Sequence, residues 1–282
     1  MNKSVKFKIA NEKQVISLTT LFKNVYKKNI LKKELEWRYL NNPNNRGEIF
    51  NCIALNKNHK IVGHTAFIKQ YFRYQDTTIS GALTSGSAVE SDYTGIFAPM
   101  YSFLEQSFKD KFDFFYGFPN KKSFPFFKKI FNYKSSNFIQ TSIKFGLNNY
   151  ALDKICSLIQ NQKISRDHSY LKWRIEQSPI NEYYSYVYNG NIIIWKPFLN
   201  GECDIVGILP SKEIVNIQSK DIPINSNLNL FITSLGNADS NALLRLFSNK
   251  NSDNFFIYKN SNSSNSKIDE MNYFQMLDID IF

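Results

Sequence analysis

Residues 35–43 read LEWRYLNNP, and residues 171–179 read LKWRIEQSP. Both stretches have the pattern Leu-x-Trp-Arg with a proline five positions after the arginine, and they lie 136 residues apart in a chain of 282. The chain has only 3 tryptophans, so it is informative that two of them hold the same place in the two halves. A repeat of this length predicts two copies of one folding unit.

The sequence around the two stretches repeats as well. A lysine-rich stretch with helical character precedes each of them, over residues 12–33 and 151–170. Two apolar runs separated by a turn follow each of them, and Asn189-Gly190 between the second pair is a strong signal for a β-hairpin. The predicted hairpin strands are Glu48–Leu55 with Ile61–Tyr71 and Tyr183–Tyr188 with Ile192–Pro197.

Each half continues with strands and helices in alternation. This pattern favours an α/β fold with a mixed (α+β) sheet in each of two domains. We expect the domains to cover residues 1–146 and 147–282, with the boundary after the strand-like run 138–145. The predicted elements are the strands Thr77–Val89, Phe112–Gly117, Leu228–Thr233 and Asn254–Lys259 and the helices Ile96–Phe108, Phe124–Ile130 and Ala238–Phe247.

Composition narrows the classes of function. The formal net charge of +11 favours anionic partners such as nucleotide phosphates, but the lysines are spread along the chain without a dense basic run, so nucleic acid is not the expected partner. The 3 cysteines are far apart and form no CxxC pair, which predicts no disulfide framework and no metal site. Residues 1–10 lack the apolar core of a signal peptide, and no apolar run approaches about 18 residues, so we expect a cytoplasmic protein without a membrane span.

Five segments of the first half occur in an order that resembles the GNAT superfamily, the acyl-CoA-dependent N-acyltransferases, and in particular one bacterial branch. The resemblance covers residues 1–145, whereas the second half shares only the Trp-Arg-Pro element and the hairpin. We therefore expect two tandem GNAT-like domains, the second of them diverged. The matching segments are Trp37-Arg38-Tyr39 with Asn42-Pro43, Lys60-Ile61-Val62-Gly63-His64, Ala88-Val89 with Asp92-Tyr93 and Gly95-Ile96-Phe97, Tyr116-Gly117-Phe118-Pro119-Asn120 with Ser123, and Lys128-Lys129-Ile130-Phe131.

The resemblance implies that acetyl-CoA, or another acyl-CoA, binds in a V between two splayed central strands of the first domain. The pyrophosphate is expected on backbone N–H groups at a helix N-terminus, where the helix dipole favours an anion. The acceptor amine attacks the thioester directly, so the chain supplies no nucleophile. The cofactor-binding residues that this implies are Ala88, Val89, Thr94, Gly95, Ile96, Phe97, Asn120 and Ser123.

The sequence departs from the family pattern at the phosphate loop and at the acid. Only Thr94-Gly95 separate Tyr93 from Ile96, which is two residues shorter than the usual Arg-Gly-x-Gly, and Pro99 has no N–H to offer. The position of the family's frequent tyrosine acid falls near Phe127, which cannot donate a proton. The candidates for catalysis are therefore the base Glu90 and the substitute acids Tyr116 and Tyr133.

Four residues are candidates for binding the acceptor: Trp37, Arg38, His64 and Ser85. Each has a structural alternative. A tryptophan at a helix end before a proline turn commonly packs in the core together with its neighbouring arginine. A histidine inside an apolar strand commonly satisfies the sheet, and a serine in a strand can bond to the backbone.

Three functions remain open at this point. The first is an N-acyltransferase that moves an acetyl group to a primary amine of a small molecule such as an amino sugar. The second is a peptidoglycan-type transferase that takes its amino acid from aminoacyl-tRNA, which the charge of +11 would suit. The third is a non-catalytic GNAT-like binding module, which the shortened Thr94-Gly95 loop would suit.

Overall fold

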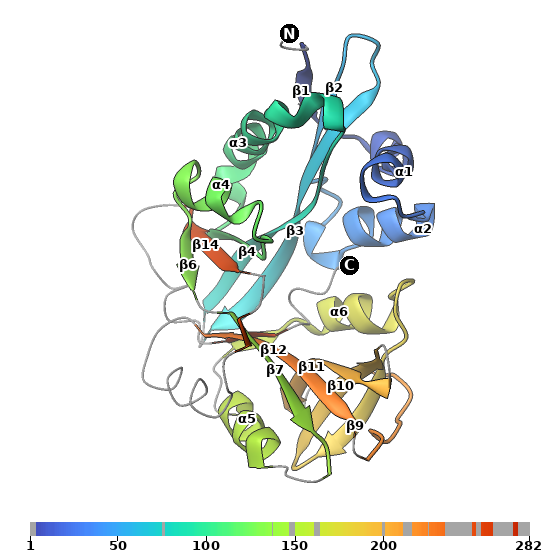
Figure 1. Cartoon of the computed structure of the whole chain (residues 1–282), viewed down its shortest axis with the longest axis vertical. Coiled ribbons are helices and arrows are strands. Elements are labelled where there is room, and N and C mark those ends of the chain that lie inside the picture. Colours follow the sequence, from blue (N-terminus) through green and yellow to red (C-terminus); the bar gives the residue numbers. More distant parts are fainter. Residues whose placement is uncertain are drawn as a thin grey trace.

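The computed structural model describes residues 4–74, 77–136, 138–146, 150–160, 164–198, 201–210, 216–224, 226–234, 250–251, 255–261 and 273–275. These residues form two mixed β-sheets that lie one above the other, each with helices packed against it (Figure 1). The mixed α/β architecture predicted from the sequence is therefore confirmed. The predicted helix 238–247 lies outside the described residues.

The first sheet is built mainly from the N-terminal half. Neighbouring strands run antiparallel, except that β4 and β5 are parallel. The predicted strand Thr77–Val89 is confirmed over its full length as β4. The strand order is β1 (Lys6–Ile9), β2 (Asn51–Leu55), β3 (Ile61–Tyr74), β4, β5 (Phe114–Gly117), β14 (Phe256–Asn260) and β6 (Lys134–Ser136), and β8 (Ile164–Arg166) pairs with β3.

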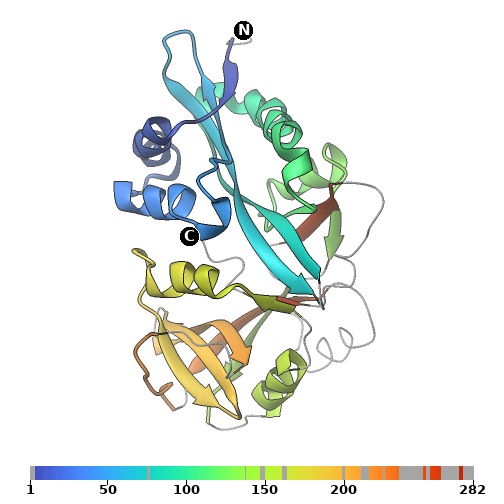
Figure 2. The same ribbon diagram turned by 180° about the vertical axis from the view of Figure 1, so that it is seen from behind.

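Helices cover both faces of the first sheet (Figures 1 and 2). Helices α1 (Glu12–Tyr26) and α2 (Lys32–Leu35) pack on one face, and α3 (Phe97–Phe108) and α4 (Phe124–Lys129) pack on the other. The predicted helix 12–33 ends early, because Lys27 adopts a left-handed conformation with φ of 58° and caps α1. Since β-strand side chains alternate between faces, the strands contribute to a core on each side.

The second sheet repeats this order of strands, and within the described residues α5 (Tyr150–Gln160) and α6 (His168–Leu171) are the helices beside it. Its order is β9 (Tyr184–Tyr188), β10 (Asn191–Pro197), β11 (Cys203–Pro210), β12 (Asn227–Ser234), β7 (Phe138–Lys144) and β13 (Lys250–Asn251), and β15 (Tyr273–Gln275) pairs with β12. The predicted hairpin turn is confirmed, because Asn189 and Gly190 have φ of 47° and 70°, as a two-residue turn of this kind requires. The stretch 151–170 forms these two helices rather than one, with β8 between them.

The two sheets exchange a strand with each other. Strand β7 follows β6 in the chain but pairs with β12 in the second sheet, and β14 follows β13 but pairs with β5 in the first sheet. In each sheet the exchanged strand lies antiparallel to the second member of a parallel pair, which is β4–β5 in one sheet and β11–β12 in the other. A division of the chain at residue 146 therefore places β7 and β14 in the half opposite to the sheet that each one joins. An open sheet edge accepts any strand of suitable pattern, so the sequence alone does not assign a strand to its sheet.

Both copies of the Trp-Arg stretch form a π-helical turn, at Glu36–Leu40 and Lys172–Glu176. In each copy the tryptophan and the arginine are buried, with Trp37 at 4% and Trp173 at 1% exposure. The two turns contact each other between the sheets, and Trp37 stacks on Trp173. The repeat is visible in the sequence, whereas the π-helical turns and strand β11 were not predicted from it.

Candidate active site

The central strands of the first sheet separate and leave a cavity. Strands β4 and β5 pair only over Gly81–Leu83 and Phe114–Tyr116, while β4 continues to Val89. A cavity of about 520 Å³ lies beyond the last paired residues. Most of its lining comes from β4, from the turn before α3 with the start of α3, and from the segment between β5 and α4 with α4 itself. Tyr26 of α1 and Ile257 of β14 complete it. The lining residues are Tyr26, Thr84, Ser85, Gly86, Ser87, Val89, Thr94, Gly95, Phe97, Ala98, Gly117, Phe118, Pro119, Asn120, Lys122, Ser123, Phe126, Phe127 and Ile257.

A β-bulge at Gly86 shapes the β4 wall of this cavity. The pairing of β3 with β4 shifts register between His64 and Ala66, and Gly86 has a positive φ of 58°. A Cβ atom at Gly86 would lie 2.0 Å from the Tyr39 hydroxyl oxygen, so only glycine fits here. The bulge is therefore a built feature of the site.

The His64 side chain is hydrogen-bonded to the backbone of the bulge. The Asn51 side-chain amide lies 2.9 Å from His64 Nε2, and His64 Nδ1 lies 2.7 Å from the Gly86 carbonyl oxygen. An amide nitrogen can only donate, so Nε2 accepts and Nδ1 carries the proton that it donates to Gly86. Burial lowers the pKa of His64 to about 4, which keeps the ring neutral near pH 7. His64 thus fixes the backbone behind the cavity wall and does not line the cavity.

The turn before α3 forms a second wall. Residues Ser91–Ile96 form 3₁₀ turns on either side of a kink at Tyr93 (φ −128°, ψ 24°), and the second turn, which contains the shortened loop, runs directly into α3. Thr94, Gly95, Phe97 and Ala98 line the cavity there. A Cβ atom at Gly95 would meet no atom within 4 Å, so the backbone at Gly95 faces open space. The positive end of the α3 dipole therefore lies at the cavity.

The segment between β5 and α4 forms the third wall. The Asn120 side-chain oxygen accepts hydrogen bonds from the backbone N–H groups of Lys122 and Ser123, both at 3.0 Å, and from the Ser123 hydroxyl at 3.1 Å. These bonds order the turn that enters α4. Asn120 and Ser123 therefore hold the shape of this wall, and Phe127 adds an apolar surface to it.

Six of the eight residues predicted to bind the cofactor line the cavity, together with Ser85. The remaining two, Ala88 and Ile96, do not: Ala88 is buried in the sheet, and the Ile96 side chain packs over Gly63. The Ser85 side chain is buried, and its hydroxyl faces the phenol of Tyr39. The six are Val89, Thr94, Gly95, Phe97, Asn120 and Ser123.

The three residues predicted to act as acid or base do not line the cavity. Glu90 accepts from the Lys60 ammonium at 2.7 Å and from the Asn24 amide at 3.2 Å. Tyr116 donates to the side chain of Gln70 in the core shared with α1. Tyr133 lies in the core on the other face. Of the predicted acceptor residues, Trp37 and Arg38 are also buried away from the cavity.

Sequence reasoning missed several lining residues. Four of them lie within or beside the matching segment Tyr116–Asn120, so that segment could have predicted them: Gly117, Phe118, Pro119 and Lys122. The bulge at Gly86 and the approach of Tyr26, whose hydroxyl donates to the Ser87 carbonyl oxygen at 2.6 Å, have no local signal.

No protein-family model and no curated protein sequence matches this chain. Solved structures do match it, over 92% of its length. A GCN5-related N-acetyltransferase from Kribbella flavida has a TM-score of 0.59 at 8% identity, with 71% of that chain covered. One from Anabaena variabilis has a TM-score of 0.57 at 10% identity, with 73% covered. A conserved protein of unknown function from Enterococcus faecalis has a TM-score of 0.59 at 12% identity, again with 73% covered.

The chain has a GNAT fold. In this GNAT fold, β4 and β5 are the two central strands that splay, and the cavity occupies the V between them. Within the described residues, no helix is long and apolar enough to cross a membrane. The same part of the chain contains no group of three or more histidine, cysteine, aspartate and glutamate side chains that could hold a metal ion.

Proposed function

We propose that this protein is an acyl-CoA-dependent N-acyltransferase that binds its acyl donor in the cavity between β4 and β5. The observation that carries the proposal is the separation of these strands after Leu83 and Tyr116, which leaves a cavity of about 520 Å³ against the N-terminus of α3. This volume lies within the range of about 300–1,000 Å³ that is usual for small-molecule sites.

The lining suits the parts of an acyl-CoA. The backbone at Gly95 faces open space at the positive end of α3, and Lys122 adds a positive charge, so this end suits the phosphates. Phe97, Phe118 and Phe126 supply apolar surface for the chain that carries the thiol. The Ser85 side chain adds a polar group to the β4 wall of the cavity.

The bound acyl-CoA would supply a thioester carbonyl to the amine. The chain's own contribution is to hold the two reactants together, which alone accounts for a large part of the rate of a bimolecular reaction. The rigid bulge at Gly86 and the ordered turn at Asn120 give the cavity a fixed shape for this purpose. We propose a primary amine of a small molecule, such as an amino sugar, as the acceptor.

The test is the thermal stability of the purified protein with and without millimolar acetyl-CoA. A ligand that binds only the native state stabilises it by about 2.7 kcal/mol at a hundredfold excess over Kd. We expect the melting temperature of the wild type to rise by several degrees. Gly95→Trp should lose this rise, because its indole would fill the open space beside the turn.

The matched control is Val187→Trp, which adds the same indole at a side chain that is 67% exposed on the second sheet, and it should keep the rise. ATP at the same concentration controls for attraction of any anion by the basic surface. A wild type that does not respond to acetyl-CoA or to longer acyl-CoAs contradicts the proposal. Binding of acetyl-CoA without turnover on any amine would favour the non-catalytic binding module.

A further inference from the structure

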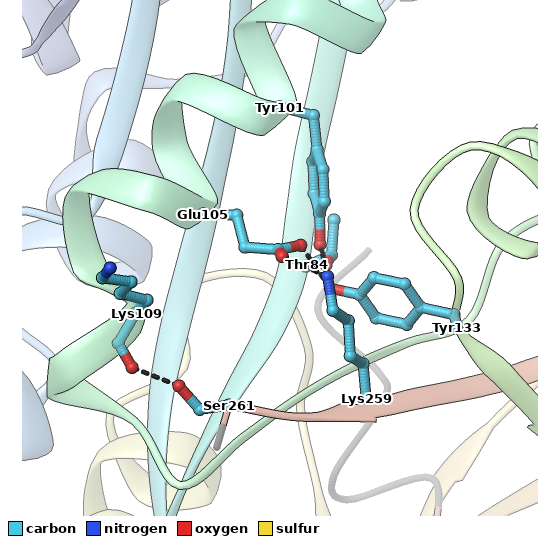
Figure 3. Close-up of polar contacts among 7 residues, drawn as sticks. All are labelled: Thr84, Tyr101, Glu105, Lys109, Tyr133, Lys259 and Ser261. Atoms are coloured by element: carbon cyan, nitrogen blue, oxygen red, sulfur yellow. Dashed lines mark hydrogen bonds and ion pairs between the residues drawn. The ribbon is translucent and has the colours of Figure 1, made fainter. Parts of the chain in front are cut away.

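A series of hydrogen-bonded side chains runs from Thr84, which lines the cavity, into the core on the α3 side of the first sheet (Figure 3). The Thr84 hydroxyl lies 3.0 Å from the Tyr101 hydroxyl, which lies 2.6 Å from the Tyr133 hydroxyl. The Tyr133 hydroxyl lies 3.4 Å from Oε2 of Glu105, and the other carboxylate oxygen of Glu105 lies 2.5 Å from the Lys259 ammonium. We call the four hydrogen-bonded residues Thr84, Tyr101, Tyr133 and Glu105 the Thr84–Glu105 chain.

This chain connects the cavity to solvent. Thr84 lines the cavity at the point where β4 and β5 separate. Tyr101 and Tyr133 are buried, at 0% and 3% exposure, so no water reaches the middle of the chain from the surface. The Glu105 side chain is 18% exposed, so its carboxylate is in contact with solvent.

The direction of the hydrogen bonds follows from Glu105, the last residue of the Thr84–Glu105 chain. An ionised carboxylate has no proton to donate, so Tyr133 donates to Glu105. Each hydroxyl has one proton, so the bond between Tyr101 and Tyr133 is donated by Tyr101, and the bond between Thr84 and Tyr101 is donated by Thr84. This leaves the Thr84 oxygen as an acceptor at the wall of the cavity. All three protons thus point from the cavity toward Glu105.

We propose that the Thr84–Glu105 chain carries the proton released by the acceptor ammonium from the cavity to Glu105 at the surface. This inference rests on the proposed function. The overall reaction is R–NH₃⁺ + R′–CO–S–CoA → R–NH–CO–R′ + HS–CoA + H⁺. The C–N bond forms, the C–S bond breaks with its electron pair on sulfur, and sulfur takes one proton from the nitrogen. The proton left over is the one that the Thr84–Glu105 chain removes.

The transfer is a series of proton hops between neighbouring hydroxyl groups. The Thr84 oxygen accepts a proton from the ammonium and passes its hydroxyl proton to Tyr101. Tyr101 then passes its hydroxyl proton to Tyr133, and Tyr133 passes its hydroxyl proton to Glu105. Glu105 becomes a carboxylic acid and then loses the proton to water. Burial raises the pKa of the Tyr101 and Tyr133 phenols above their usual range. The two phenols therefore stay neutral, and they act as relays rather than as an acid and a base with charges of their own.

The second half of the polypeptide supplies the partner of Glu105 at the surface. Lys259 belongs to β14, a strand that the second half contributes to the first sheet, and it pairs with Glu105 of α3 (Figure 3). In the same view the Ser261 hydroxyl donates to the Lys109 carbonyl oxygen, which ties the end of β14 to the end of α3. The exchanged strand thus places a cation beside the carboxylate at which the transfer ends.

The test compares Tyr101→Phe, Thr84→Val and Glu105→Gln with the wild type, and Tyr186→Phe in the second sheet serves as the matched control. The measurements are acetyl-CoA binding by thermal shift, kcat as a function of pH and the solvent deuterium isotope effect on kcat. General acid–base steps typically contribute about 10²–10⁴-fold to a rate. We expect Tyr101→Phe and Glu105→Gln, which lie outside the cavity lining, to bind acetyl-CoA like the wild type. All three variants should lose at least about tenfold in kcat near pH 7.

The loss should shrink as the pH approaches the pKa of the acceptor amine, because a neutral amine has no proton to export. Three titratable groups face Glu105: Tyr133, Lys259 of β14, and Tyr101 on the same helix, α3. Of the three substitutions, only Glu105→Gln changes a charge. Thr84→Val keeps the test decisive if Tyr101→Phe does not fold. Variants with the kcat, pH profile and isotope effect of the wild type overturn the inference and leave the proposed function intact. A wild type that neither binds acetyl-CoA nor acylates an amine overturns both.

Discussion

Trp37 and Trp173 each donate a hydrogen bond from the indole nitrogen to the backbone carbonyl oxygen of the other, at 2.9 Å in both directions. Their rings are stacked, with centroids 4.9 Å apart and planes inclined by 23°. A reciprocal contact between equivalent residues is the geometry of a two-fold axis. The two copies of the repeated stretch therefore meet each other, and they join the two halves of the molecule.

The Trp37–Trp173 contact should behave as one energetic unit. Trp37→Phe and Trp173→Phe each leave a buried carbonyl without its donor, which costs about 1–3 kcal/mol. We expect the free energy of unfolding of the double variant to fall by less than the sum of the two single losses, because both variants break the same stacked pair. Urea denaturation of the four proteins measures this difference. Strictly additive losses would show that the two indoles act independently.

Gly86→Ala should destabilise the first sheet severely. The new Cβ would lie 2.0 Å from the Tyr39 hydroxyl oxygen at a φ of 58°, and losses above about 4 kcal/mol arise from such steric mechanisms. Tyr39→Phe in the same protein should restore part of the stability, because it removes the oxygen that the Cβ meets. Gly95→Ala is the control, since its Cβ meets no atom, and thermal unfolding of all variants gives the comparison. A Gly86→Ala variant as stable as Gly95→Ala would contradict the bulge.

His64 should make stability depend on pH below neutrality. Burial lowers its pKa from 6.5 to about 4, so below pH 6.5 the unfolded chain takes up a proton that the folded chain does not. The free energy of unfolding should therefore fall as the pH decreases from about 6.5 to 4, by about 3 kcal/mol for a shift of this size. His64→Gln should lose stability at neutral pH but show a shallower decrease over this range, as urea titrations at several pH values would measure. His59→Asn, at an exposed position, should follow the wild type. Parallel curves for wild type and His64→Gln would exclude this origin.

The exchanged strand β14 should affect the ligand as well as the stability. Ile257 in β14 is fully buried and lines the cavity, whereas Leu228 in β12 is equally buried in the second sheet. Each replacement by alanine should cost about 2–5 kcal/mol of stability. Only Ile257→Ala should change the rise in melting temperature that acetyl-CoA produces. Equal responses of the two variants to acetyl-CoA would show that β14 supports the fold but not the site.

The sequence by itself determined the local structure and the region of the site. The repeated Leu-x-Trp-Arg stretch predicted two related units, Asn189-Gly190 predicted a tight hairpin turn that φ of 47° and 70° confirms, and β4 has the predicted bounds Thr77–Val89. These features depend on residues near one another in the chain, such as a turn residue that tolerates positive φ. The segments around Thr94 and Asn120, which the resemblance pointed to, line one cavity.

Only the tertiary structure decided how these parts combine. A strand's apolar pattern says which face is buried but not which edge it joins, so the exchange of β7 and β14 is not written in either segment. The bulge at Gly86 depends on Tyr39 and His64, which are distant in sequence. The same reason placed Tyr133 in the core beside Tyr101 rather than in the cavity, because hydrogen bonds between side chains from different elements form only after the elements have packed.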